Sequence, residues 1–193
     1  MIFETRSRSA GLVRISIIKL LTLQLLCLSA RSTRKEIMII ATLCYVKHNG
    51  KTLMVHRNKK PNDIHEGKWN GLGGKFEAGE TPEECIKREV QEEAGLLIQN
   101  PLLHGLLMFP NFKGNDWYVF VFTAHEFDGE LLESSPEGRL EWIDNDKLTS
   151  LNLWESDHIF LPWLTAGKFF SAKFEYEGNV MQSYDVTFHE HLK

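Results

Sequence analysis

The chain has 193 residues, which suffices for one domain with a substantial core. With 42% hydrophobic residues, 25% charged residues and a mean hydropathy of -0.26, the composition excludes a disordered chain and a polytopic membrane protein. Three scattered cysteines (Cys27, Cys44 and Cys85) imply no disulfide framework.

The net charge of -4 is an average over two unlike parts of the chain. Residues 1–37 carry seven Lys/Arg against two Glu, a net charge of +5, whereas residues 38–193 carry 15 Lys/Arg against 24 Asp/Glu, a net charge of -9. Such an asymmetry suggests a segment appended to an acidic domain. The acidic domain argues against binding to a nucleic-acid polymer, which selects a basic surface.

The basic segment, residues 1–37, has three interpretations. An apolar run over 15–28, interrupted by Lys19, is short for a membrane span but resembles the core of a signal peptide. The Arg- and Ser-rich composition suits an organellar transit peptide equally. Because Met38 directly precedes an apolar strand, the segment is alternatively sequence upstream of the true start. We therefore expect an N-terminal extension (1–37) and a domain (38–193) without membrane association, cytoplasmic unless the extension is a transit peptide.

The domain alternates strand patterns with two helical segments. Apolar alternation and turn signals predict strands over 39–46, 51–56, 102–109, 117–125, 139–143, 169–176 and 180–188. Turns are expected at Asn49-Gly50, over 114–116 and over 177–179, and a loop over 57–73. Helices are expected over 82–94 and over 155–165, the latter interrupted near Pro162. The prediction is an α/β (α+β) fold in which a mixed β-sheet packs against helices.

The helix over 82–94 has clear start and stop signals. Thr81 can cap it, Pro82 suits its first position, Glu84 completes a T-x-x-E capping box, and Gly95 ends it. At about 100° per residue, one stripe of this helix is apolar and should be buried. That stripe comprises Ile86, Val90 and Ala94.

Three glutamates crowd a neighbouring face of the same helix: Glu89, Glu92 and Glu93. Like charges at this spacing repel each other, so the helix gains no intrinsic stability from them. Clustered carboxylate oxygens are the ligands that Mg²⁺ or Mn²⁺ takes, usually together with substrate phosphates. The alternative is a solvated acidic face balanced by Lys87 and Arg88.

The segment 74–96, GKFEAGETPEECIKREVQEEAGL, resembles the signature of the Nudix hydrolases at every fixed position. The resemblance implies a Nudix fold, with the sheet sandwiched between helices (α/β/α), and hydrolysis of nucleoside diphosphate derivatives with a divalent cation, Mg²⁺ or Mn²⁺. It implies metal ligation by Glu89, Glu92 and Glu93, and an orienting role for Arg88 through salt bridges. Glu80 would be a supporting acid that helps hold the loop–helix–loop in shape. Gly73 and Gly74 would let a phosphate approach the backbone, although a plain turn explains them as well.

Beyond this signature, segments resemble the MutT/MutX-like branch of the family, the 8-oxo-dGTP diphosphatases. Asn70, in GKWNGLGGK, matches an asparagine that hydrogen-bonds the base, and its amide suits a purine edge. Glu137 falls where that branch has a late glutamate near the metals, a candidate ligand or general base. Trp154 and Asp157 resemble a base clamp. The chain departs from the animal enzymes in having Ser156 where they have a second acid.

Phe109 is a further candidate for the substrate pocket, and a core aromatic at a strand end is the alternative. The function expected from this resemblance is Mg²⁺-dependent conversion of 8-oxo-dGTP to 8-oxo-dGMP and pyrophosphate by a monomer or homodimer. One alternative is a Nudix pyrophosphohydrolase that acts on undamaged dNTPs, dinucleoside polyphosphates or ADP-ribose. Another is a catalytically silent nucleotide-binding module, although such a module should have lost carboxylates that this chain retains.

Overall fold

The computed structural model describes residues 37–59 and 64–190, which belong to one compact unit spanning 37–193. Residues 1–36 lie outside the described residues, so the three interpretations of the N-terminal extension remain predictions. Within the described unit, no helix is long and apolar enough to cross a membrane.

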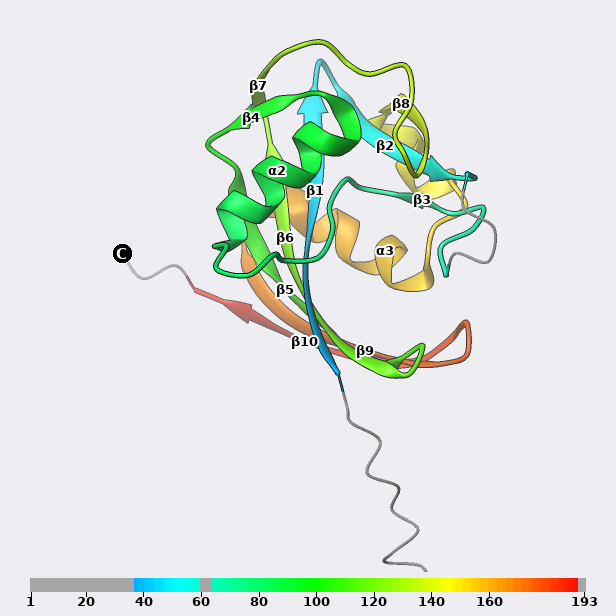
Figure 1. Cartoon of the computed structure of the whole chain (residues 1–193). Coiled ribbons are helices and arrows are strands. Elements are labelled where there is room, and N and C mark those ends of the chain that lie inside the picture. Colours follow the sequence, from blue (N-terminus) through cyan, green and yellow to red (C-terminus); the bar gives the residue numbers. More distant parts are fainter. Residues whose placement is uncertain (1–36, 60–63, 191–193) are drawn as a thin grey trace, which may run out of the picture. The chain divides into compact units, whose positions relative to one another are not determined.

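A mixed sheet forms the centre of the unit (Figure 1), with the strand order β10-β9-β5-β6-β1-β2-β3 and β8 beside β2. Its strands are β1 (Met38–His48), β2 (Lys51–Arg57), β3 (Trp69–Asn70), β5 (Leu102–Phe112), β6 (Asn115–Ala124), β8 (Gly138–Asp144), β9 (Phe169–Glu177) and β10 (Val180–His189). The pairs β1–β6 and β5–β9 are parallel, and the other pairs are antiparallel. The predicted mixed sheet is therefore confirmed.

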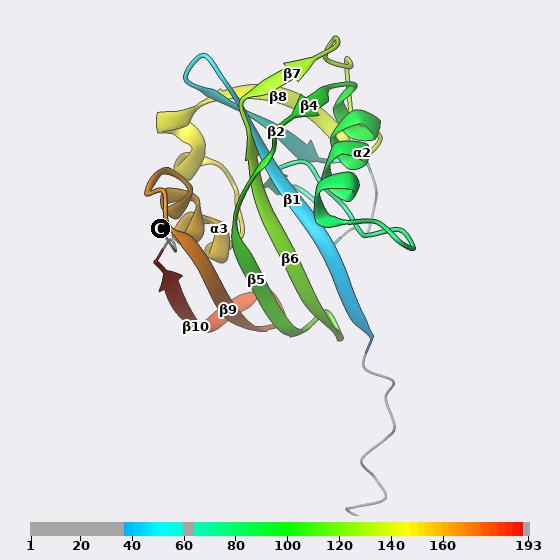
Figure 2. The ribbon, with the colours of Figure 1, turned by 90° about the vertical axis from the view of Figure 1, so that its left-hand side faces the viewer.

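Alternate residues of β1 divide the hydrophobic core between the two faces of the sheet. Cys44 and Val46 pack in the cluster under helix α2 (Pro82–Ala94), whereas Tyr45 packs in the cluster with Phe160 of α3 (Glu155–Phe160). Successive side chains of a strand point to opposite faces, so this division places the two helices on opposite sides. Figure 2 shows α2 and α3 on either side of the strands. The expected α/β/α arrangement is confirmed.

The predicted turn and caps are present. Asn49 (φ 48°) and Gly50 (φ 75°) connect β1 to β2 with two positive φ angles, as a tight type I′ hairpin requires. At the start of α2, Thr81 Oγ1 accepts a hydrogen bond from Glu84 N at 3.2 Å, and the Glu84 carboxylate accepts one from Thr81 N at 2.8 Å. Gly95 ends the helix in the left-handed conformation. These hydrogen bonds fix the start of α2, the helix that carries Glu89, Glu92 and Glu93.

Several short elements were not predicted from the sequence. The predicted loop over 57–73 contains β3, and the turn after β5 lies at Lys113-Gly114, both with positive φ, rather than over 114–116. Two strands of three residues each, β4 (Leu97–Gln99) and β7 (Glu126–Asp128), pair in a separate small sheet, and the 3₁₀ helix η1 covers Asn145–Ser150. Such short elements have too few residues to display a period. The interruption near Pro162 is confirmed, because α3 gives way to the 3₁₀ helix η2 (Leu161–Thr165).

Candidate active site

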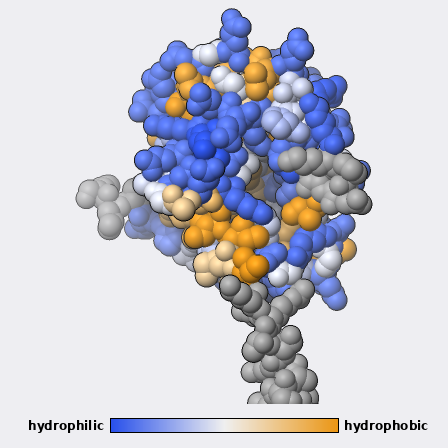
Figure 3. Space-filling view, in the orientation of Figure 1, coloured by the Kyte–Doolittle hydropathy of each residue, from blue (hydrophilic) through white to orange (hydrophobic). Residues whose placement is uncertain are grey.

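A cavity of about 780 Å³ opens beside α2 and extends to the residues around α3. Figure 3 shows a hollow next to the hydrophilic surface of α2, with hydrophobic side chains gathered below that surface in the same view. Of the twelve site residues predicted from the sequence, nine line the cavity: Asn70, Gly73, Gly74, Arg88, Glu89, Phe109, Glu137, Trp154 and Asp157. The other three, Glu80, Glu92 and Glu93, do not contribute to its lining.

The glycine-rich loop before α2 lies directly along β1. Thr42 N donates to Gly74 O at 2.8 Å, and Cys44 and Leu72 exchange backbone hydrogen bonds at 2.6 and 3.0 Å. At Gly73 (φ 146°), a Cβ atom would lie 2.2 Å from the carbonyl oxygen of Thr42. Because only glycine tolerates this approach, the loop backbone can form one wall of the cavity.

Arg88 joins three carboxylates and the loop. Its Nε and Nη2 donate to the two oxygens of Glu80 at 2.6 and 2.9 Å, and its Nη1 donates to Glu89 at 2.8 Å and to Glu92 at 3.4 Å. Nη2 also donates to the carbonyl oxygen of Lys75 at 3.1 Å. The hydrogen bonds from Arg88 lower the pKa of Glu80 to about 2, so Glu80 stays ionised as the anchor of this network. This geometry suits the predicted orienting role of Arg88.

The three helix glutamates have different surroundings. Glu89 lines the cavity beside Gly74, Glu92 has a side chain that is 59% exposed, and Glu93 is buried and accepts a hydrogen bond from Gly73 N at 3.0 Å. Among residues 37–59 and 64–190, no three acidic, His or Cys side chains are close enough to form a metal cluster as they stand. The side chains of Glu89, Glu92 and Glu93 nevertheless fit a hard cation, because they offer carboxylate oxygens as ligands. Ligand roles for these glutamates remain predictions.

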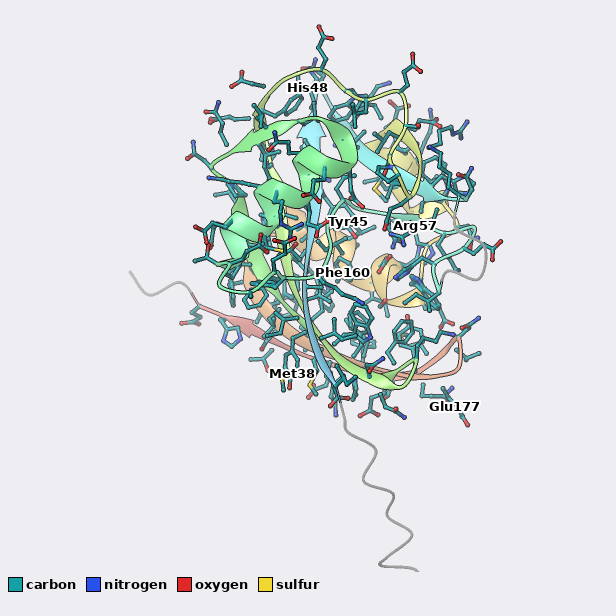
Figure 4. All side chains as sticks on the ribbon, in the orientation of Figure 1. Met38, Tyr45, His48, Arg57, Phe160 and Glu177 are labelled. Carbon is teal, nitrogen blue, oxygen red and sulfur yellow. The ribbon has the colours of Figure 1, made fainter. Side chains whose placement is uncertain are left out.

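Glu137 enters the cavity from the segment that precedes β8. Its carboxylate forms an ion pair with Arg57, at the end of β2, and both side chains are mostly buried. Arg57, labelled in Figure 4, also lines the cavity. The structure therefore brings Glu137 to the same cavity as Glu89, from a distant part of the chain.

Asp157 and Ser156 form a buried polar group where α3 lines the cavity. Burial raises the pKa of the Asp157 carboxyl group to about 7, far above its usual value, so the neutral and ionised forms are both accessible near neutral pH. Ser156 Oγ donates to Asp157 Oδ1 at 3.4 Å and accepts from the hydroxyl of Tyr176 at 3.0 Å. Asp157 is the acid of this pair, and its role in binding a base stays a prediction.

Aromatic side chains wall this part of the cavity. Trp154 Nε1 donates to His65 Nδ1 at 2.9 Å, and the Trp154 ring makes edge contacts with Phe112 and Tyr176. Phe109 both lines the cavity and stacks on Phe174, so the pocket and core interpretations each describe part of its surroundings. Phe112 and Tyr176 were not singled out from the sequence, because alternation within a strand does not reveal which aromatic residue faces a cavity.

Asn70 lies on β3, where it pairs with Val55 of β2. Its side-chain oxygen is buried and, within the described part of the chain, has no hydrogen-bond partner. A buried amide oxygen usually has a partner, so this one is suited to meet a donor on a bound molecule.

The NUDIX domain model matches residues 38–164, about two thirds of the chain. The chain belongs to the Nudix family. A relative named oxidized purine nucleoside triphosphate hydrolase, from Danio rerio, is 33% identical over 141 residues, which cover 72% of this chain and 88% of that protein. A mouse protein of the same name is 35% identical over 113 residues, or 58% of this chain and 71% of that protein.

Solved structures agree with this assignment. The Nudix fold of this chain superposes on a structure described as the mutator MutT protein from Bacillus halodurans with a TM-score of 0.68 and 32% sequence identity. The match covers 77% of this chain and 97% of the Bacillus chain. This Nudix hydrolase is therefore MutT-like over nearly the whole described unit.

Proposed function

We propose that this Nudix hydrolase converts 8-oxo-dGTP to 8-oxo-dGMP and pyrophosphate and so removes oxidised purine nucleotides. One observation carries the proposal: a single cavity is lined both by Glu89 and Arg88 of the Nudix signature on α2 and by Trp154 and Asp157 around α3, the helix on the other face of the sheet. A nucleoside triphosphate has its phosphates and its base at opposite ends, and it matches that distribution. The names of the fish and mouse relatives support the same substrate class.

In this proposal, the base lies against Trp154, and Asn70 and Asp157 hydrogen-bond its edge. The amide of Asn70 offers a donor and an acceptor, and Asp157 offers either, depending on its protonation. The phosphates lie along the Gly73-Gly74 backbone toward Glu89. Arg88 holds Glu89 in place rather than touching the substrate, because its guanidinium nitrogens are already bonded to Glu80, Glu89 and Glu92.

A divalent cation, Mg²⁺ or Mn²⁺, would be held by Glu89, Glu92, Glu93 and Glu137. Such a cation neutralises phosphate charge and lowers the pKa of a bound water. Glu89 and Glu137 already line the cavity, and Glu92 is exposed enough to turn toward a ligand. We propose that one of these carboxylates also takes the proton of the attacking water. The protein acts as a monomer or homodimer without a nucleic-acid polymer as partner.

A substrate panel tests the proposal most directly. 8-oxo-dGTP, dGTP, ADP-ribose and diadenosine polyphosphates are compared by kcat/KM, with pyrophosphate and phosphate measured separately. We expect 8-oxo-dGTP to be the best substrate and pyrophosphate to be the released product. A preference for ADP-ribose or a dinucleotide would overturn the substrate assignment, and the absence of turnover on every substrate would indicate a silent binding module.

Matched variants test the assigned residues. Glu92→Gln removes one proposed metal ligand and should lower kcat at least a hundredfold, whereas Glu83→Gln, on the exposed first turn of α2, should not change it. Asn70→Ala should raise KM for 8-oxo-dGTP about tenfold, the effect of one lost hydrogen bond to the base. Wild-type kinetics in Glu92→Gln would contradict the metal assignment.

A further inference from the structure

The hydroxyl of Tyr45 is a buried polar group that belongs neither to the proposed metal ligands nor to the proposed base-binding residues. Tyr45 lies on β1, lines the cavity and is fully buried, with its ring 6.2 Å from that of Phe160 (Figure 4). Its Oη has no hydrogen-bond partner among the described residues. Since burial without a partner costs free energy, this hydroxyl is expected to gain a partner when the cavity is filled.

The Tyr45 ring packs against the glycine-rich loop at Gly71, where the loop has no side chain. A Cβ atom at Gly71 would lie 3.1 Å from the Tyr45 ring atom Cε1 and 2.7 Å from the carbonyl oxygen of Cys44. Gly71 directly follows Asn70, the proposed base-binding residue. The Tyr45 ring therefore lies directly beneath the segment that would contact a purine.

Asp157 is the group that Tyr45 can serve. Both residues line the cavity, and the Tyr45 ring packs against Phe160, which follows Asp157 by one turn on α3. Burial, and after it the nearby Asp157 carboxyl group, raises the pKa of the Tyr45 hydroxyl well above its usual value. Tyr45 therefore remains protonated and can donate a hydrogen bond at any physiological pH. A neutral hydroxyl can also accept one if Asp157 is protonated.

Ser156 cannot fix the Asp157 carboxyl group alone. Its Oγ already accepts a hydrogen bond from Tyr176, and its own bond to Asp157 Oδ1 is long, at 3.4 Å. Its backbone N–H also donates to the Tyr176 hydroxyl at 3.0 Å. Ser156 and Tyr176 thus satisfy each other, and besides the long bond from Ser156 the Asp157 carboxyl group interacts with the backbone of Trp154.

We propose that Tyr45 is a positioning residue for Asp157: when a purine base fills the cavity, the Tyr45 hydroxyl hydrogen-bonds the Asp157 carboxyl group and fixes the orientation in which that group meets the base. The inference rests on the proposed function, because it takes Asp157 as the group that binds the purine edge. It adds a residue of β1 to a base site otherwise built from Asn70 of β3 and the segment around α3.

A double-mutant cycle of Tyr45→Phe and Asp157→Asn tests the inference. Phenylalanine keeps the ring and removes only the hydroxyl. We expect Tyr45→Phe to raise KM for 8-oxo-dGTP about tenfold and to leave kcat within about twofold of wild type. In the Asp157→Asn background the same substitution should have a much smaller effect, because the two residues act as a unit. An unchanged KM, or additive effects, would overturn the proposal.

Thermal stability distinguishes positioning from a structural role. Tyr45→Phe removes a hydroxyl that has no partner in the protein, so Tm should stay the same or rise. Tyr176→Phe is the matched control: it removes a hydroxyl bonded to Ser156 and should lower Tm. A fall in Tm for Tyr45→Phe as large as that for Tyr176→Phe would show that the hydroxyl serves the fold, and would contradict the proposal.

Binding of the product 8-oxo-dGMP, measured by calorimetry, separates failure of this inference from failure of the proposed function. If the wild type binds 8-oxo-dGMP but does not hydrolyse 8-oxo-dGTP, the proposed reaction fails, and the cycle still decides the role of Tyr45 through Kd. If the wild type hydrolyses 8-oxo-dGTP and the cycle is additive, only the inference fails. Absence of both binding and turnover overturns both.

Discussion

The carboxylate of Glu89 occupies the space that a side chain at position 74 would need. A Cβ atom built on Gly74 would lie 2.4 Å from the carboxylate carbon and from both oxygens of Glu89. The Gly74 backbone cannot easily retreat, because its carbonyl oxygen accepts a hydrogen bond from Thr42 N on β1 at 2.8 Å. Glu89 is also restrained, by Arg88. A side chain at position 74 would therefore displace the Glu89 carboxylate from its place beside the loop.

Gly74→Ala should displace the Glu89 carboxylate and lower kcat about a hundredfold or more, since a misplaced catalytic group of this kind costs about that factor. Circular dichroism should show a folded protein. The matched control is Gly50→Ala in the β1–β2 turn, where φ is 75° and no atom lies within 4 Å of the added Cβ. That variant should lose about 1 kcal/mol of stability through backbone strain but keep its kcat. Normal turnover in Gly74→Ala would contradict the role given to Glu89.

Arg88→Lys should reduce kcat/KM about 10- to 100-fold and weaken the response to Mg²⁺, as is typical when a residue that orients metal ligands is changed. Lysine keeps the charge but cannot reproduce the paired hydrogen bonds to Glu80 and the bond to Glu89. The control is Arg139→Lys, whose partner Glu141 is exposed, so that kinetics and stability should hardly change. Equal effects of the two substitutions would show that the Arg88 network has no special role.

Asp157 should make the stability of the protein depend on pH. Its pKa is raised from 3.8 to about 7 by burial, so the folded state retains a proton that the unfolded chain has lost. This contribution to the free energy of unfolding is fully present below about pH 4 and is lost as the pH rises through 7. The total loss is on the order of 4 kcal/mol. Asp157→Asn should lack this loss. Urea unfolding of both proteins at pH 4 to 8 measures the difference, and parallel curves would contradict the buried, protonated carboxyl.

Removal of divalent cations with a chelator should abolish pyrophosphate release without unfolding the protein. Glu89 and Glu93 already have hydrogen-bond partners in the protein, Arg88 and Gly73 N, so the fold does not depend on a cation to neutralise them. Tm should therefore change little, and activity should return with Mg²⁺ or Mn²⁺. Turnover that survives the chelator would exclude the proposed metal chemistry.

Local patterns predicted most of the elements and the chemistry of the Nudix signature. The ends of α2 could be predicted because capping depends only on neighbouring residues, here Thr81, Pro82 and Glu84 at the start and Gly95 at the end. The hairpin at Asn49-Gly50 depends equally on local φ preferences. The three-residue strands β4 and β7 were missed because their pairing, Ile98 with Phe127, depends on contacts between distant segments.

The arrangement of the site could not be obtained in the same way. Helical spacing predicts Glu89, Glu92 and Glu93 on one side of α2. In the fold, Glu89 lines the cavity, Glu92 is exposed to solvent and Glu93 accepts a hydrogen bond from the Gly73 amide. These differences arise from what packs against each side chain, which the helical period does not contain.

The sequence alone determined the family, the acidic charge of the domain and the residues of the Nudix signature, because these depend on residue identity and short spacings. The tertiary structure decided that Tyr45 of β1, Glu137 before β8 and Asp157 of α3 share one cavity. Tyr45 and Asp157 are more than 100 residues apart along the chain, and only the packing of the sheet against α3 brings them together. The same packing buries Asp157 and changes its proton affinity, a property that no local pattern can specify.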